Sequence, residues 1–458
     1  MVNSKKCGQL AVGIIIFILF NCIISNYLDL NSMETETRRT YFYLRDSLSR
    51  QAEKISPLKA EKPWFMKGGT RWPTPAEVDQ SGKRKTKLWP HEDPDSDRML
   101  NQYMFVPPVS PKPRPTKKIL MWPTIIFWEE PKGSTGMIPF ASCPVSNCEL
   151  TTNEEEAAKV DAIVFLHHYI DHEVHFRQQR TKHQVWIYYS MESPIWTKIP
   201  KGLDVFNWTA TYMQRSDIPR PYGKWIFYNE SKTEWDGPPR NFASGKTKKV
   251  AWFVSNCKAS NNRWEFATEL SQYIQVDIYG RCGKLKCDSE DKKCDEYLDK
   301  DYKFYLAFEN CNCREYITEK FFRKGLGHKV IPIVMGAPKE DYERVAPKDS
   351  FIHVEDFATP RDLAAYLYEV DRDDNLFNSY FKWKDMGEVL YPYFYCRLCA
   401  MLHDDHIPRK YHPNFHDFWK APNSCIGERY WRDLKREIGG ELPSVSWNGN
   451  DEKSVKID

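Results

Sequence analysis

Short apolar runs alternate with amphipathic segments along most of this chain beyond residue 118, and this alternation constrains the fold more than any other feature. The runs are rich in β-branched and aromatic residues, as buried strands are. They lie at 118–123, 161–168, 184–190, 249–255, 275–280, 303–308 and 329–334. The segments between them, such as 262–274 and 318–326, are typical of amphipathic helices. The alternation predicts an α/β fold of doubly wound units with parallel sheets.

A polar stretch at 235–248, which contains two prolines and a glycine, divides the runs into two groups. It predicts a linker between one domain at 118–240 and a second at 241–400. The remaining 401–458 form a tail that is rich in aromatic residues and histidines at its start and is harder to assign.

The N-terminus carries an apolar run from Leu10 to Ser25, preceded by Lys5 and Lys6. It is either a cleaved signal peptide or a signal anchor, and the lack of a small-x-small cleavage motif favours an anchor at 10–26. Lysines on the N-terminal side keep residues 1–9 cytoplasmic, which predicts a type II membrane protein. Residues 27–117 are polar and rich in proline, which predicts a stem that acts as a spacer.

The charge balance and the cysteines narrow the function and the compartment. There are 66 basic and 63 acidic residues, a net charge of +3, which argues against a nucleic-acid partner. Of 13 cysteines, all but Cys7 and Cys22 follow the anchor, where a lumen would let disulfides form. The sequons at Asn207 and Asn229 predict glycosylation in that compartment.

The most informative segment runs from Phe304 to Phe351. A buried strand ends at Glu309 and Asn310, and a loop leads to Thr318, a candidate N-cap, with Glu319 and Lys320 in the first turn of a helix. A strand end beside a helix start with a lysine favours a phosphate ligand. On the pattern alone, a capped and solvated first turn explains these residues equally simply.

The motifs in this segment resemble those of the α1,3-fucosyltransferases, glycosyltransferase family ten, in order and spacing. The matching motifs are Phe-Glu-Asn310, Tyr316-Ile-Thr-Glu319-Lys320, Pro332-Ile-Val and the run from Ser350 to Phe357. Further matches are Val254-Ser-Asn256 with Arg263, the run from Trp186 through Glu192 to Pro194, the run from Phe206 to Tyr212, and Pro221-Tyr-Gly223. The similarity extends from about Lys118 to Cys425.

The resemblance implies a GT-B-type fold, in which two Rossmann-like domains face a cleft. The C-terminal domain would then bind GDP-fucose, the N-terminal domain would hold the acceptor, and one in-line displacement would invert the sugar centre. Such a transferase would face the Golgi lumen. The resemblance implies the following roles: Glu192 as general base, Glu319 beside the fucosyl ring, Arg263 and Lys320 on the diphosphate, and Asn256, Asn310 and Tyr316 in the donor site.

No residue cluster predicts a metal site strongly. Asp93, Asp95 and Asp97 form D-x-D patterns but lie in the predicted stem, and a surface loop explains His403 to His406 better than a metal site does. Arg263 and Lys320 can neutralise the leaving diphosphate, so we expect no required cofactor, although manganese could stimulate the reaction.

The pair Cys396 and Cys399 lacks a second C-x-x-C to complete a zinc site. The family resemblance implies instead that this pair bridges back to cysteines at the start of the catalytic region, for which Cys143 and Cys148 are the candidates. The other luminal cysteines cannot be paired from the sequence.

The acceptor is predicted from resemblance alone. The run from Asn378 to Lys384, the run from Tyr395 to His403, and the later Asp417-Phe-Trp and Cys425 are more similar to invertebrate core enzymes, which modify the Asn-linked GlcNAc, than to Lewis-type enzymes, which modify antennal GlcNAc. An inactive glycan-binding relative is a third alternative, but the presence of Glu192, Arg263 and Lys320 argues against it. The oligomeric state stays open.

Overall fold

The computed structural model describes residues 62–80, 84–85, 87–88, 97–123, 134–168, 176–197, 205–287, 292–407 and 415–442. These residues belong to one compact unit that begins at Lys62. None of the helices in these ranges is long and apolar enough to cross a membrane. The expected anchor at 10–26 lies outside the described residues.

The first sheet has five parallel strands in the order β2-β1-β3-β4-β5. The strands are β1 (Lys117–Trp122), β2 (Cys148–Thr151), β3 (Ala162–Leu166), β4 (Val185–Ser190) and β5 (Trp208–Thr211). Every residue of β4 and β5 is buried, as expected for strands covered on both faces. Their carboxyl ends share one edge, where Glu192 follows β4.

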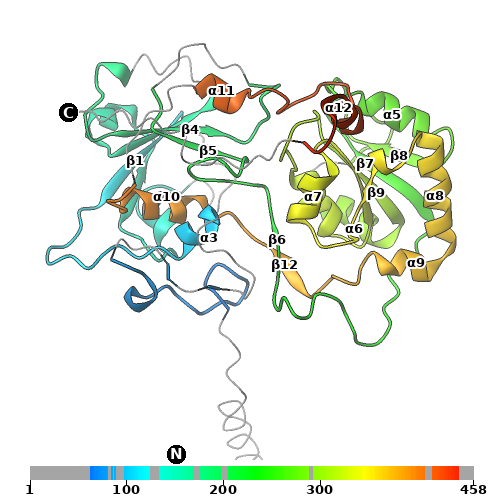
Figure 1. The fold of residues 1–458 in the computed structure, drawn as a ribbon, viewed down its shortest axis with the longest axis horizontal. Helices are drawn as coiled ribbons and strands as arrows, with labels where there is room; N and C mark the ends of the chain where they lie inside the picture. The colour runs from blue at the N-terminus through cyan, green and yellow to red at the C-terminus, as the bar shows by residue number, and fades with distance from the viewer. Residues whose placement is uncertain are drawn as a thin grey trace, which may run out of the picture. The chain divides into compact units, whose positions relative to one another are not determined.

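The second sheet is also five-stranded and parallel, in the order β11-β10-β9-β7-β8. Its strands are β7 (Lys248–Phe253), β8 (Val276–Tyr279), β9 (Tyr302–Phe308), β10 (Ile331–Met335) and β11 (Ile352–His353). The strand β9 lies at the centre and is buried throughout, and helices surround this sheet (Figure 1). The predicted α/β fold with parallel sheets is confirmed in both halves.

The helices of the second half begin with α5 (Arg263–Leu270) after β7. They continue with α6 (Lys292–Lys300), the π-helical η5 (Lys320–Leu326), α7 (Lys339–Val345), η6 (Val354–Asp356), α8 (Pro360–Arg372) and α9 (Asp374–Ser379). The predicted helix after Thr318 is therefore present, but it begins at Lys320. Glu319 already has helical backbone angles, and Thr318 O accepts the Phe322 N–H at 3.2 Å, so Thr318 precedes the helix as predicted. Its hydroxyl donates to Glu309 Oε2 at 2.9 Å and accepts the Lys320 N–H at 3.5 Å.

Two strands pair where the chain passes between the sheets. The short β6 (Trp225–Phe227) lies antiparallel to β12 (Gly387–Val389), which returns from the second half (Figure 1). Within the predicted linker, Trp235 N donates to Lys382 O at 2.7 Å, so the outgoing and returning segments also bond to each other beyond the strands.

The structure differs from the expected stem between Lys62 and residue 117. Trp64, Phe65 and Tyr103 are buried in the same core as the first sheet, and Trp64 Nε1 donates to Tyr103 O at 3.0 Å. The elements here are η1 (Pro75–Glu77) and α3 (Arg98–Tyr103). The aromatic side chains among the prolines bury enough apolar surface to order this segment. The prediction of a spacer was based on the overall polar composition and overlooked these side chains.

The C-terminal helices pack against both halves of the protein. The helix α10 (Phe394–Leu402) packs into the core of the first sheet, α11 (Phe415–Trp419) packs on its other face, and α12 (Trp431–Ile438) follows. Trp431 Nε1 donates to Gly336 O at 2.8 Å, which places α12 against the second half. The remaining short helices are η2 (Ile138–Phe140) and η3 (Glu154–Lys159).

Five disulfides join described cysteines. Cys143 bonds to Cys396 and Cys148 to Cys399, so the four candidate cysteines tie α10 to the first sheet as the resemblance implies. The other bonds are Cys257–Cys282, Cys287–Cys294 and Cys313–Cys425. Cys311 is the one free thiol in the described part of the chain, and it is buried.

Candidate active site

The carboxyl end of the central strand β9 carries a fully buried carboxylate, Glu309. Its Oε1 accepts the Thr318 N–H at 2.7 Å, and its Oε2 accepts the Thr318 hydroxyl at 2.9 Å. The ammonium of Lys320 lies 3.3 Å from Oε2. This carboxylate therefore has donors on both oxygens, as a buried charge requires.

Lys320 is held on three sides. Its Nζ donates to Thr318 Oγ1 at 2.9 Å and to Glu319 Oε1 at 3.2 Å, in addition to its contact with Glu309. Burial alone lowers the pKa of Lys320, but the two carboxylates outweigh burial and hold that pKa above its usual value. The side chain is 24% exposed, so this fixed cation remains accessible at the end of β9.

Glu319 is the more exposed of the two carboxylates, with 46% of its side chain accessible. Burial acts to raise the pKa of Glu319, but the adjacent Lys320 ammonium and hydrogen bonds hold it below the usual value. Glu319 is therefore an anion at neutral pH, placed beside a fixed cation.

Arg263, the first residue of α5, is buried and braces the backbone of the site. Its Nη1 donates to Phe308 O at 2.8 Å and its Nη2 donates to Asn256 O at 2.7 Å. The resemblance implies that Arg263 binds the diphosphate; in this structure both of its terminal nitrogens bond main-chain carbonyls. The guanidinium instead holds the segment after β7 against the end of β9.

Several polar atoms at this place are buried without a hydrogen-bond partner among the described residues. They are Arg263 Nε, Asn261 Oδ1 and Asn310 Oδ1. The backbone oxygen of Asn310 accepts Ser260 N–H at 3.1 Å, and the side chain of Asn256 accepts Lys258 N–H at 3.1 Å. Buried polar atoms are almost always satisfied, so these orphan atoms mark where a polar ligand would complete the site.

The first half of the chain reaches this site through Glu192. The carboxylate of Glu192, two residues beyond β4, accepts the hydroxyl of Tyr316 at 3.2 Å from Oε2 to the phenolic oxygen. Tyr316 belongs to the loop between Glu309 and Lys320. The hydrogen bond therefore joins the carboxyl-end edges of two separate sheets.

Tyr222 lies beside the same groups. Its hydroxyl donates to Met191 O at 2.7 Å, and its ring contacts that of Tyr316 edge to face. Burial raises the pKa of Tyr222 well above its usual value, and the charges of Glu319 and Glu192 raise it further. The sequence motif contained Tyr222, but nothing in it indicated that this side chain would lie between the two carboxylates.

The two glycosylation predictions differ in outcome. Asn207 is 3% exposed, and its Oδ1 accepts Arg180 Nη2 at 2.7 Å and Trp186 N at 2.8 Å. A glycan has no room on this side chain in the folded protein, so the prediction at Asn207 is contradicted. Asn229 is exposed in the loop after β6, and that prediction stays open.

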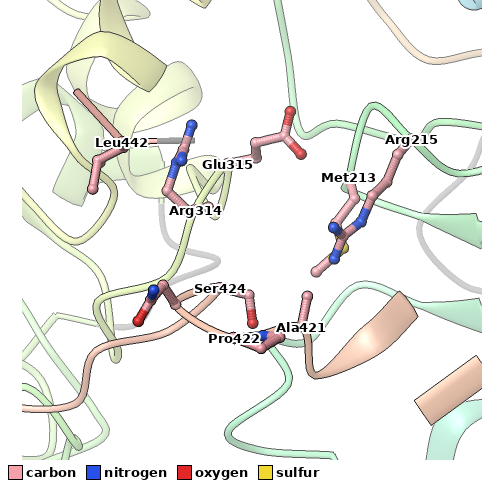
Figure 2. A pocket seen from close by; sticks show the side chains of 9 residues that line it. Met213, Arg215, Arg314, Glu315, Ala421, Pro422, Ser424 and Leu442 are labelled. Carbon is pink, nitrogen blue, oxygen red and sulfur yellow. The ribbon is translucent and has the colours of Figure 1, made fainter. Parts of the chain in front are cut away.

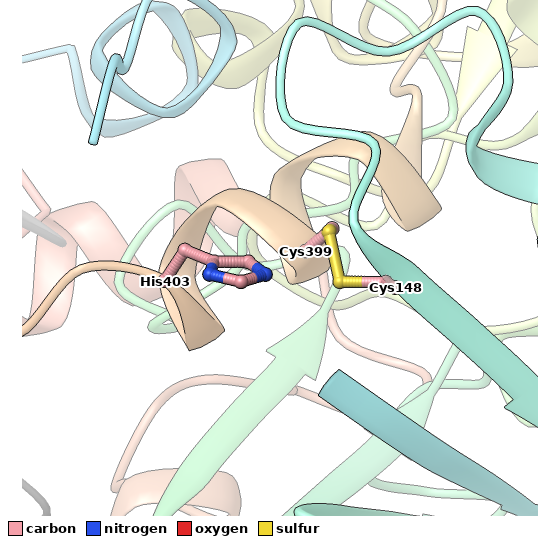
Figure 3. A group of neighbouring side chains, drawn as sticks. All are labelled: Cys148, Cys399 and His403. Atoms are coloured by element: carbon pink, nitrogen blue, oxygen red, sulfur yellow. A yellow bond between two sulfur atoms is a disulfide. The ribbon is translucent and has the colours of Figure 1, made fainter. Parts of the chain in front are cut away.

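Cys148, Cys399 and His403 form a group with the spacing of metal ligands. Figure 3 shows that the two sulfur atoms are bonded to each other, which removes them as thiolate ligands. The Nε2 of His403 lies 2.9 Å from Asn147 O, a hydrogen bond that explains its burial. The arrangement is structural.

A cavity lies between the loop after β5, the loop that contains Arg314 and Glu315, and the C-terminal segment. Figure 2 shows Arg215 and Met213 on one side, Arg314 and Glu315 on another, and Ala421, Pro422 and Ser424 below. Its lining contains none of the predicted site residues, so the cavity is separate from the Glu192–Lys320 site.

Comparisons with known proteins identify the family of this chain. Residues 243–418 match the C-terminal domain of glycosyltransferase family 10 (fucosyltransferase), and residues 114–223 match the fucosyltransferase N-terminal domain. The chain is 45% identical over 395 residues to glycoprotein 3-alpha-L-fucosyltransferase A of Drosophila melanogaster, covering 84% of this chain and 78% of that protein. The chain therefore belongs to glycosyltransferase family 10 and is an α1,3-fucosyltransferase.

Other relatives are more distant. Alpha-(1,3)-fucosyltransferase C of Drosophila melanogaster is 37% identical over 62% of this chain and 71% of its own length. The 4-galactosyl-N-acetylglucosaminide 3-alpha-L-fucosyltransferase FUT6 of Homo sapiens is 36% identical over 62% of this chain and 79% of its own length. A solved α1,3-fucosyltransferase with GDP-fucose has 16% identity and a TM-score of 0.44 over 68% of this chain and 97% of its own.

Proposed function

We propose that this chain transfers L-fucose from GDP-β-L-fucose, with inversion, to the 3-hydroxyl of the Asn-linked GlcNAc in N-glycan cores. The observation that carries the proposal is the 3.2 Å hydrogen bond from Tyr316 to Glu192. It brings a carboxylate from one sheet to the loop that holds Lys320 and Glu319 on the other. In this proposal the two halves form a GT-B-type pair with the site between them.

In the proposed reaction, Glu192 is the general base. Its carboxylate takes the proton of the acceptor hydroxyl while the hydroxyl oxygen forms a bond to C1 of fucose. The bond from C1 to the GDP oxygen breaks, and GDP leaves with the electron pair. A single displacement of this kind converts the β-linked donor into an α-linked product.

The donor side supplies fixed charge. Lys320 would neutralise the leaving diphosphate, and Glu319 would stabilise the positive charge that develops on the fucosyl ring. Arg263 would add positive charge from its buried place beside the end of β9. Asn256 and Asn310 would offer amide groups to the nucleotide or sugar. Since the two cations can replace a divalent ion in this role, we propose that transfer needs no metal and that manganese at most stimulates it.

The acceptor assignment is supported by the pattern of similarity. The Drosophila relative whose name specifies a glycoprotein acceptor matches 84% of this chain, whereas the human relative named for a galactosyl-GlcNAc acceptor matches 62%. A Lewis-type acceptor, the antennal GlcNAc, is the alternative. The five disulfides support a luminal, Golgi-facing catalytic region, since such bonds persist in oxidising compartments.

The test is product mapping. The full-length protein is incubated with GDP-fucose and, separately, a truncated N-glycopeptide and a lactosamine-terminated glycan, with and without chelator. The proposal predicts fucose in α1,3 linkage on the Asn-bound GlcNAc by mass spectrometry and NMR. Transfer to lactosamine alone would assign a Lewis-type acceptor, and transfer to neither would favour an inactive glycan-binding protein.

A further inference from the structure

Glu309 places a carboxyl group in the buried interior, directly after the last residue of β9. The side chain is fully buried, and the seven residues of β9 before it are all buried. Taking a carboxylate out of water is costly, and replacing a buried ion pair by apolar residues is often neutral or stabilising. A structural role alone therefore does not account for a glutamate here.

The backbone around Glu309 is shaped to admit it. Gly336, directly after β10, has φ +148°. A Cβ at this position would come within 2.7 Å of Glu309 Cβ and 2.8 Å of its Cγ. The neighbouring strand therefore leaves out a side chain in order to make room for the glutamate, while Glu309 N donates to Met335 O at 2.8 Å.

The carboxylate of Glu309 contacts Thr318 and Lys320. One oxygen accepts the Thr318 N–H, and the other accepts the Thr318 hydroxyl and faces the Lys320 ammonium. The same hydroxyl oxygen accepts a hydrogen bond from Lys320 Nζ. Lys320 has a long, flexible stem, and these bonds fix its ammonium at one point at the end of β9.

We infer that Glu309 is a positioning residue, whose buried carboxylate holds the Lys320 ammonium, through Thr318 and directly, where the donor diphosphate is neutralised. The inference rests on the proposed donor role of Lys320. Glu309 itself touches neither donor nor acceptor. Its effect on catalysis passes through the lysine.

The substitution Glu309→Gln tests this role. A glutamine keeps an oxygen for the Thr318 N–H but turns an N–H₂ group toward Thr318 Oγ1 and Lys320 Nζ, so the ammonium loses its place. We expect kcat/KM for GDP-fucose to fall about 10- to 100-fold, the size of effect that a small misplacement of a charge produces. The KM for the acceptor and the linkage of the product should stay unchanged.

The decisive measurement is a double-mutant cycle on the full-length protein with Lys320→Ala. If Glu309 acts through Lys320, Glu309→Gln adds little loss in the Lys320→Ala background, because the group that it positions is gone. An equal loss in both backgrounds would overturn the inference, as would full activity of Glu309→Gln beside an impaired Lys320→Ala. Full activity of Lys320→Ala would remove the proposed donor role as well.

Two further variants separate positioning from folding. Thr318→Val keeps the shape of the side chain but removes the hydroxyl between Glu309 and Lys320. A smaller loss of kcat/KM for GDP-fucose, absent in the Lys320→Ala background, supports the inference even if Glu309→Gln folds poorly. A loss of kcat/KM that is equal in both backgrounds contradicts it. Calorimetric GDP binding should weaken in parallel, a readout that does not depend on turnover.

The matched control is Asp371→Asn. Asp371 pairs with Lys303 at 3.3 Å, near the opposite end of the same strand β9, and the two side chains are 11% and 8% exposed. This substitution changes a largely buried carboxylate that pairs with Lys303 and also with Lys249, at 2.7 Å. It should lower the melting temperature and leave the kinetics for GDP-fucose unchanged; a donor defect equal to that of Glu309→Gln would contradict a specific role for Glu309.

Discussion

Glu309 and Glu315 are buried glutamates on the same loop, and burial raises the pKa of both carboxyl groups, but their polar partners differ. Glu309 has donors on both oxygens and a lysine in contact. Glu315 accepts one N–H, from Gln214 at 3.3 Å, and its nearest cation is Arg344 at 3.7 Å. Burial, and next the Asp341 carboxylate, raise the pKa of Glu315 to about 7.

This pKa predicts a pH dependence of stability. A carboxyl group whose pKa is higher in the folded chain than in the unfolded chain stabilises the fold only while it is protonated. Its contribution is complete below the unfolded value and is lost as pH rises toward about 7. We expect Glu315→Gln to raise the melting temperature by a few degrees at about pH 7.5 and to have little effect at about pH 5.

The check is thermal unfolding of both proteins across that range. Arg215, Arg344 and Asp341 also act on the Glu315 carboxyl, so only the difference between the two curves reports on it. Parallel curves, with no widening toward neutral pH, would contradict the prediction.

A second prediction concerns the hydroxyl of Tyr316. Burial raises the pKa of this phenol well above its usual value, so it remains a hydrogen-bond donor to Glu192 at neutral pH. Tyr316→Phe removes that donor and keeps the ring, which packs against Tyr212. Since a hydrogen bond to a charged group contributes about 1.5–3 kcal/mol, kcat should fall on the order of ten-fold or more.

The measurement is steady-state transfer together with GDP binding. We expect GDP affinity to persist, because the lost bond is made to Glu192, the proposed base, and not to Lys320. An unchanged kcat would show that the contact does not orient Glu192.

At the scale of elements, the alternation of apolar and polar residues predicted the strands and one helix, because local sequence determines these elements. The runs at 161–168, 184–190, 249–255, 275–280, 303–308 and 329–334 overlap β3, β4, β7, β8, β9 and β10, with ends that differ by at most a few residues. The helix after Thr318 was also predicted, although its hydrogen bonding is π-helical. The position of α10 against the first sheet depends on contacts far along the chain, and the sequence indicated it only through resemblance in its cysteines.

A disulfide between Cys313 and Cys425, 112 residues apart, joins the C-terminal segment to the loop between Glu309 and Lys320. Beside it, Arg314 N donates to Ser424 O at 2.7 Å and Ile426 N donates to Asn312 O at 2.9 Å. A disulfide that closes a long loop restricts the unfolded chain more than one that closes a short loop. Cys287 and Cys294, 7 residues apart, provide the comparison.

We therefore expect the double substitution of Cys313 and Cys425 to serine to cost about 2–4 kcal/mol of unfolding free energy, and the serine pair at 287 and 294 to cost less. Thermal or denaturant unfolding of the two variants measures the difference. A larger loss from the short bridge would contradict this ranking.

At the scale of the whole molecule, the sequence predicted the members of the site better than their contacts. Glu192, Glu319 and Lys320 were named from motifs, and the structure brings them to one place. The orientation of Arg263 toward Phe308 O and Asn256 O was not predictable, because it depends on how two loops pack. The burial of Asn207 depends likewise on the sheet that covers it.

The sequence analysis did not single out Glu309, because its contacts also depend on how distant segments pack. Glu309 stands inside a recognised motif, but only the lack of space at Gly336 and the bonds from Thr318 point to the positioning role that we infer for it. A glutamate directly after the mostly apolar run from Phe304 to Phe308 was the signal in the sequence that could have singled it out.

The proposed mechanism requires that Glu192, from one half, acts as base on the acceptor while the other half holds the donor. The most direct test is Glu192→Gln in the full-length protein, measured for fucose transfer and, by calorimetry, for GDP binding. The account predicts a loss of transfer of at least about 100-fold with GDP affinity unchanged. Transfer at the original rate, or the loss of GDP binding together with transfer, would contradict it.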